Sequence, residues 1–221
     1  MKKLIMIFAI FFLMASAAFS QGLGIGGGLS FWTNNDITLN NVHDLDIINK
    51  DEKAGLNVNL RVKFNSGFIA YTLNAGWNRF VISEVSLFEP TSANTYCFTL
   101  SQNIFPVSPG LQLNLIDLKV VNIYLGGEVS FNFIKNSIDN SRSYSVGSSG
   151  VLDNIPSMIM FGDETQFRIG AAPSAGVEIN LGVITLDINA KLHYMNVINT
   201  KPGEEITTYL MANVSVFFGG R

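Results

Sequence analysis

The sequence predicts an all-β protein, an eight-stranded antiparallel up-and-down transmembrane β-barrel, and three observations support this prediction. Many segments alternate apolar and polar residues with period two, as a strand with two unlike faces does. Charged residues make up only 14% of the chain, against about 25% in soluble domains, and the mean hydropathy is +0.29. After the N-terminal segment, no apolar run reaches the length of about 18 residues that a membrane-spanning helix needs. Strands are therefore expected to cross the bilayer.

The N-terminus has the features of a secretory signal peptide. Lys2 and Lys3 provide a basic start, residues 4–14 are apolar but too short to span a bilayer, and small residues precede Gln21. We therefore expect residues 1–20 to be a signal peptide. Residues 21–221 are expected to form one outer-membrane β-barrel domain in the cell outer membrane. The alternative is that the same segment remains as an N-terminal membrane anchor.

The clearest predicted strand covers residues 121–133. Its odd positions, from Val121 to Phe133, are apolar or glycine, whereas its even positions are polar, tyrosine or glycine. Its length exceeds the usual strand of about 5–6 residues and suits a tilted membrane-crossing strand, which needs about 9–11. Glu128 lies mid-strand on the polar face.

Seven further segments alternate in the same way. Their connections alternate between long and short, which is typical of an up-and-down barrel with tight periplasmic turns and longer external loops. Long connections are expected at 33–54, 81–94 and 135–164, and residues 154–161 could form a short helix or fold back. Because Pro106 and Pro109 cannot donate ladder hydrogen bonds, we expect a bulge or bend near them in one long strand. The seven strands are predicted at 23–32, 55–65, 68–80, 95–116, 165–181, 184–194 and 206–218.

The composition of the two faces predicts which one meets lipid. The polar faces are rich in Asn, Gly, Ser and Thr with isolated charges, whereas a water-facing exterior would carry many more Lys and Glu. The apolar faces are therefore expected outside, which inverts the arrangement of a soluble lipocalin-like barrel, the alternative fold. Aromatic residues near strand ends are predicted to form two interfacial girdles. The periplasmic girdle would contain Phe64, Tyr71 and Phe218, and the outer girdle Phe31, Trp32, Trp77, Phe131, Phe133, Phe167 and Tyr194.

The inward face of the predicted barrel carries charges of both signs. An eight-stranded barrel is only just wide enough for side chains, and an unpaired buried charge is costly. We therefore expect these groups to pair in a polar network that fills the lumen, with Glu128 paired to Arg61, Arg168 or Lys191. The functional alternative is a gated ion path through Glu128 and Arg168. The basic members are Arg61, Lys63, Arg168 and Lys191, and the acidic members are Glu128, Glu178 and Asp187.

The signal segment, the eight alternating strands and the final V-S-V-F-F together resemble a known family. The chain is similar to small outer-membrane β-barrel proteins of the OmpA/OmpX type, and most to the PorT-like outer-membrane β-barrel group common in Bacteroidota. The resemblance covers residues 21–221 and departs from the usual pattern at the end, where Gly219, Gly220 and Arg221 follow the terminal aromatic residue.

These features predict a non-enzymatic outer-membrane barrel whose external loops have structural or binding roles. A narrow, porin-like ion or solute channel is the main alternative. A lipid-modifying enzyme is the third possibility, but His43 and His193 show no spacing typical of a Ser-His-acid site. No cofactor or metal is expected. The expected partners are outer-membrane lipids, the barrel assembly machinery, and a protein or ligand at the external loops. The net charge of −3 argues against nucleic acid.

Overall fold

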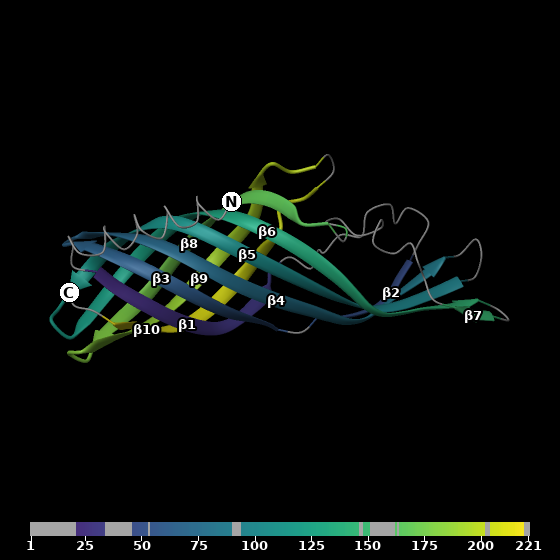
Figure 1. Cartoon of the computed structure of the whole chain (residues 1–221), viewed down its shortest axis with the longest axis horizontal. Coiled ribbons are helices and arrows are strands. Elements are labelled where there is room, and N and C mark those ends of the chain that lie inside the picture. The colour runs from purple at the N-terminus through teal and green to yellow at the C-terminus, as the bar shows by residue number, and fades with distance from the viewer. Residues whose placement is uncertain are drawn as a thin grey trace, which may run out of the picture.

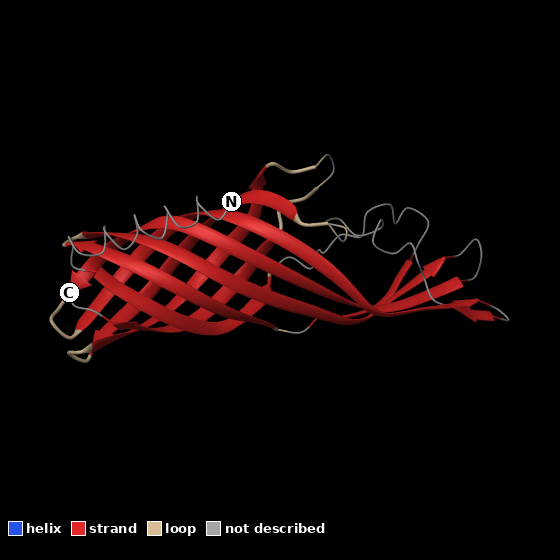
Figure 2. Cartoon of the chain, in the orientation of Figure 1, coloured by secondary structure: helices blue, strands red, loops and turns tan. Residues whose placement is uncertain are grey.

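A computed structural model describes residues 21–33, 46–52, 54–89, 94–145, 148–150, 162, 164–201 and 204–218. The predicted signal segment at 1–20, His43 and the possible helix at 154–161 lie outside these ranges. All regular structure within them is β-strand (Figure 2). The strands are β1 (Gln21–Trp32), β2 (Asp46–Glu52), β3 (Gly55–Ser66), β4 (Ile69–Glu89), β5 (Asn94–Asp117), β6 (Val121–Ser145), β7 (Ser148–Gly150), β8 (Gln166–Asn180), β9 (Ile184–Ile198) and β10 (Thr208–Phe218).

Eight of these strands form a closed antiparallel ring. Hydrogen bonds run in the order β4-β3-β1-β10-β9-β8-β6-β5, and the pairing of β4 with β5 closes the circle. The first and last strands meet with Leu23 opposite Phe218. The tilted strands and the closed cylinder are visible in Figure 1. The predicted eight-stranded up-and-down barrel is confirmed.

Short turns close one end of the barrel, which we call the turn end. The β3–β4 and β8–β9 turns contain Gly67 and Gly182 at φ 80° and 91°, a backbone region that glycine adopts without steric cost. The side-chain oxygen of Asn180 accepts a hydrogen bond of 2.9 Å from the backbone N–H of Gly182. Both the start of β1 and the end of β10 lie at this end, beside the short turns (Figure 1).

The opposite end continues into a sheet, formed by segments that the sequence predicts to be loops. Residues 81–89 continue β4 without interruption, and β6 runs on to Ser145 instead of ending near 134. β2 pairs with β4 and β7 pairs with β6, so β2, β4, β5, β6 and β7 form an extension beyond the ring (Figure 1). The prediction of long loops was therefore wrong at 46–52, 81–89, 135–145 and 148–150, which form strands. In these segments the outward face is less apolar than in the barrel, because this part of the sheet lies beyond the barrel wall.

The register explains how the extension keeps an apolar interior. A bulge between Ile82 and Val85 shifts the β4–β5 register, and such an extra residue exchanges the two faces of a strand. Val85 and Leu87 therefore turn to the same side as the lumen, where they are buried. A bulge or bend was predicted near Pro106 and Pro109 in one long strand. The strand is continuous and has no bulge there, because Val107 to Gly110 keep one register with both neighbouring strands.

The two faces of the barrel have the polarity predicted for a membrane protein. Ile25 and Leu60 point outward and are 57% and 48% exposed, whereas Arg61 and Asp187 point inward and are 3% and 0% exposed. The exterior is a belt of large apolar side chains and the interior is polar, opposite to a soluble barrel. Among the described residues, no helix has the length and apolarity needed to cross a bilayer.

Candidate functional site: the polar lumen

The lumen contains buried ion pairs that join strands across the barrel. Each pair brings one basic and one acidic side chain within 2.5–2.8 Å, and every side chain in them is at most 8% exposed. The structure places all seven predicted lumenal charges on the inward face, together with an eighth, Glu204. The pairs are Lys63–Glu178, Arg61–Asp187, Lys191–Glu128 and Arg168–Glu204.

The layer nearest the turn end is centred on Glu178 of β8. Its carboxylate accepts hydrogen bonds from Lys63 at 2.5 Å, from the Asn122 amide at 2.8 Å and from the Gln112 amide at 3.1 Å. The side-chain oxygen of Asn114 accepts hydrogen bonds from the amide groups of Gln112 and Asn122. Because donors from β3, β5 and β6 converge on one carboxylate, the charge is held by the surrounding wall rather than by a single partner.

The next layer is centred on Asp187 of β9. The Arg61 guanidinium donates to Asp187 at 2.6 Å and the Tyr124 hydroxyl donates to it at 2.8 Å. Asn189 donates to the same carboxylate at 3.1 Å. The guanidinium carbon of Arg61 also lies 5.8 Å from the ring centres of Tyr124 and Phe217, a cation–π distance. Tyr124 was missed as a network member, although its even position on the polar face of residues 121–133 signalled it.

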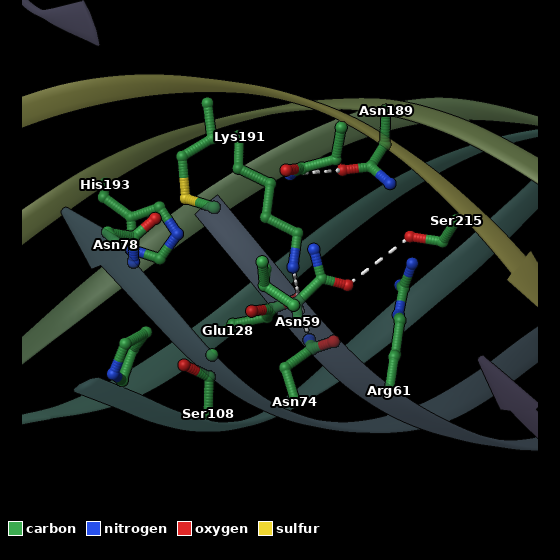
Figure 3. A pocket seen from close by; sticks show the side chains of 15 residues that line it. Asn59, Arg61, Asn74, Asn78, Ser108, Glu128, Asn189, Lys191, His193 and Ser215 are labelled. Atoms are coloured by element: carbon green, nitrogen blue, oxygen red, sulfur yellow. Dashed lines mark hydrogen bonds and ion pairs between the residues drawn. The ribbon is translucent and has the colours of Figure 1, made fainter. Parts of the chain in front are cut away.

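The third layer joins β4, β6 and β9 through Glu128. Its Oε1 accepts from Lys191 Nζ and from the Asn74 amide, both at 2.6 Å (Figure 3). Of the three partners that the sequence allowed for Glu128, the structure selects Lys191. A cavity of about 20 Å³ lies beside these groups and Arg61, which is space for about one water molecule.

Glycines make room for these long side chains. A Cβ on Gly110 would lie 2.6 Å from Cγ of Glu128, and one on Gly176 would lie 2.5 Å from the Tyr124 hydroxyl. Both distances are far below van der Waals contact, so larger residues there would displace the network.

Arg168 lies away from these layers, near the end of the barrel that carries the extension. It does not approach Glu128, and its guanidinium instead holds Glu204 of the β9–β10 connection through bonds of 2.8 and 3.1 Å from Nε and 2.8 Å from Nη2. Asn196 and the backbone N–H of Lys201 donate to the same carboxylate. Burial alone would raise the pKa of Glu204, but the bonds from Arg168, Lys201 and Asn196 outweigh it and hold the pKa below its ordinary value. The predicted ion path through Arg168 and Glu128 therefore lacks the contact between them.

An apolar plug closes the lumen beyond the charged layers. It consists of six buried inward-facing residues and the partly buried Trp32, which together come from six strands. The ring centres of Trp32 and Phe80 lie 4.2 Å apart, and those of Trp32 and Tyr209 lie 5.7 Å apart. The polar path is therefore interrupted by packed side chains. The members of the plug are Trp32, Phe80, Ile104, Ile134, Met195, Tyr209 and Met211.

Trp32 differs from its predicted position in the outer girdle. Its predecessor Phe31 faces outward, so the alternation along β1 turns Trp32 inward, where it packs against the plug. It also contacts a second buried cluster in the extension, formed by Val85, Leu87, Phe98 and Leu100. Trp32 thus joins the barrel interior to the extension.

The other predicted girdle residues lie on the outward face. At one end, Phe64 lies opposite Tyr71 across β3 and β4. At the other end, the Phe167 ring is stacked with that of Phe131 at 6.4 Å and tilted by 48° against that of Phe133 at 5.3 Å. Their role at a membrane interface remains a prediction. The outward-facing residues are Phe31, Phe64, Tyr71, Trp77, Phe131, Phe133, Phe167, Tyr194 and Phe218.

His193, the described candidate for catalysis, is a packed lumenal side chain. It is buried, and its ring lies parallel to that of Tyr209 with centres 4.7 Å apart. Within the described residues, no cluster of three or more His, Cys, Asp or Glu side chains is arranged to hold a metal ion.

The fold and the lumen define a class: an eight-stranded barrel with an apolar exterior and a filled polar interior. No family model matches the chain, and no curated protein matches it. Among solved structures it is similar to Neisserial surface protein A, at 11% identity and a TM-score of 0.45, covering 91% of this chain and 97% of the other. It is similar to OprG, an outer membrane protein from Pseudomonas aeruginosa, at 11% identity and TM-score 0.45, covering 91% and 94%. It is also similar to Ail, the attachment invasion locus protein of Yersinia pestis, at 10% identity and TM-score 0.43, covering 89% and 96%.

Proposed function

We propose that the chain is a non-enzymatic, non-conducting barrel of the outer membrane that holds a β-sheet extension outside the bilayer for structural or binding roles. The observation that carries this proposal is the inverted polarity, with Ile25 and Leu60 exposed outside and charges paired inside. An apolar exterior of this kind is stable only in lipid or against another apolar surface.

The height of the apolar belt supports a membrane location. On β5 the outward residues from Phe105 to Leu115 form a continuous apolar series that spans ten residue steps. At about 3.4 Å per residue, this is about 34 Å of strand, or about 26 Å of height at a tilt of about 40°. A membrane barrel has an apolar band about 25 Å tall.

Membrane insertion is tested first. The mature chain, refolded from urea into lipid vesicles, is expected to float with the vesicles and to migrate differently in gel electrophoresis before and after boiling. A protein that remains soluble without detergent would contradict the proposal. The signal peptide at 1–20, the assembly machinery as a partner and membership of the PorT-like group remain predictions under it.

A narrow channel is the second candidate function, favoured by the polar layers around Glu128 and Lys191. The apolar plug weighs against it, because Trp32, Phe80 and Tyr209 occupy the lumen beyond those layers. Planar-bilayer recording separates the two: the native protein is expected to show no steady openings. Steady openings that disappear in Glu128→Gln would establish the channel instead.

The extension is the proposed binding surface. It carries its own buried cluster of Val85, Leu87, Phe98 and Leu100, so the sheet is packed rather than held only by backbone bonds. Tyr96 packs against this cluster and donates a hydrogen bond to Glu89 at 2.8 Å. On the other face, Cys97 and Ser86 are in contact at 3.4 Å. Deletion of residues 83–98 is expected to remove binding to external partners while leaving the barrel folded.

A further inference from the structure

Two exposed basic residues share one row on the outer wall of the barrel. Arg79 on β4 pairs in register with Asn103 on β5, and Asn103 pairs with Lys135 on β6. Both basic side chains are exposed and point outward. Among strand residues whose side chains the structure describes, these are the two outward-facing basic ones, and a single strand separates them.

This row lies immediately beyond a row of aromatic residues. Trp77 precedes Arg79 by two positions, and Phe133 precedes Lys135 by two; Phe105 follows Asn103 at the same interval. Because strand residues two apart share a face, each of the three strands has an aromatic residue directly below the polar row. Phe105 is also the last residue of the apolar series on β5, so the row marks the outer edge of the belt.

The row has the donors that a phosphate requires. A guanidinium binds phosphate through two parallel N–H bonds and an ammonium binds it as a point charge. Adjacent strands are about 4.8 Å apart, so Arg79 and Lys135 leave the wall about 10 Å from each other, and their long side chains can converge over Asn103. Trp77 Nε1 donates to Asn103 Oδ1 at 3.0 Å, which directs the other side of that amide, the NH₂ group, away from the indole.

The nearest acidic side chain that the structure describes on β6 beyond Lys135 lies farther out. Asp139 is four residues beyond Lys135 on β6, opposite Thr99 of β5, which is about 13 Å along the strand. Glu164 is exposed just before β8. The positive pair therefore has apolar and aromatic surface below it, and Asp139 of β6 lies above it.

We propose that Arg79, Asn103 and Lys135 bind the phosphate of an anionic lipid headgroup, with the lipid's acyl chains lying on Phe105 and Phe133. This inference rests on the proposed membrane location. It assigns the outward row a specific ligand class, a phosphorylated membrane lipid. The aromatic row beneath it favours a lipid over free phosphate, because free phosphate would make no use of the apolar surface.

The test compares two lipids that carry the same acyl-chain dansyl label, phosphatidic acid and phosphatidylcholine, in nanodiscs that hold the refolded barrel. Energy transfer from tryptophan to the label is expected to saturate at a lower fraction of phosphatidic acid. Each basic side chain near a membrane surface contributes about fivefold in affinity. Arg79→Gln/Lys135→Gln is therefore expected to weaken the binding of phosphatidic acid about 25-fold and leave phosphatidylcholine unchanged.

Matched controls make the outcome decisive. Lys119→Gln, in the β5–β6 turn at the opposite end, removes one exposed lysine and is expected to keep the preference. An inserted, heat-modifiable double variant that keeps the native preference overturns this inference alone. Displacement of the label by excess inorganic phosphate overturns the assignment to a lipid. Failure of the native chain to insert into any bilayer overturns both this inference and the proposed function.

Discussion

Removal of one partner of the Lys191–Glu128 pair is predicted to be among the most destabilising single changes in the barrel. The two groups are 2.6 Å apart, and their side chains are 8% and 3% exposed. Loss of one partner leaves a buried charge unpaired, which costs about 3–5 kcal/mol. We expect both Lys191→Met and Glu128→Gln to lower the free energy of unfolding by that amount, and the double variant to lose much less than the sum.

Urea unfolding of the barrel in lipid vesicles, followed by tryptophan fluorescence, measures these values. With a dependence of about 2 kcal/mol per molar urea, each single variant should shift the midpoint downward by about 1.5–2.5 M. The coupling energy from the double-mutant cycle should reach about 3 kcal/mol, at the upper end for directly contacting residues. Lys201→Met, which removes an exposed lysine, is the control and should leave the midpoint unchanged. Additive single effects would refute the claim that the pair acts as a unit.

Three further predictions concern the apolar plug, the β9–β10 connection and the lumenal glycines. Trp32→Ala/Phe80→Ala removes two members of the apolar plug. This double variant is expected to conduct ions in planar bilayers, whereas the native protein is expected not to. A double variant without conductance would mean that the charged layers close the lumen by themselves. Because the pKa of Glu204 is lowered in the fold, its bond to Arg168 stabilises the β9–β10 connection fully above the unfolded pKa of about 4.3 and is lost as pH falls through the lower folded value. Proteolysis at 199–207 should therefore increase at acidic pH in the native chain, and at neutral pH in Arg168→Gln; equal cleavage in both at every pH would contradict this. Gly176→Val places a Cβ against a buried tyrosine hydroxyl and should cost about 1–3 kcal/mol on unfolding, whereas Gly127→Val, which meets open space, should not.

The barrel itself could be predicted because its strands repeat one simple pattern. Residues 121–133 alternate without a break, and the outward apolar face carries through into every neighbouring strand. The alternation also fixed which charges point inward, since Arg61, Lys63 and Asp187 all occupy polar-face positions. The alternation did not predict which of these charges form ion pairs. Lys191 and Glu128 are 63 positions apart, and only the register of the closed ring brings them together.

The extension could not be predicted because the alternation changes where the sheet leaves the barrel. The bulge between Ile82 and Val85 exchanges the faces of β4, so a fixed period-two reading fails at that point. Trp32 was misplaced for a related reason: aromatic residues near strand ends were assigned to a girdle regardless of which face they occupy. Glu204 was missed because it lies in a connection, where no periodicity marks an inward side chain.

The lumen keeps charge and closure in separate layers. Four basic and four acidic groups are paired within 2.8 Å, so this set is electrically balanced and presents no excess of either sign to an entering ion. Closure is provided elsewhere, by the apolar plug around Trp32. Trp32 also packs against the cluster of Val85, Leu87, Phe98 and Leu100, so the plug and the extension are in direct contact. The charged layers thus stabilise the wall, whereas the seal belongs to the same packed unit as the external sheet.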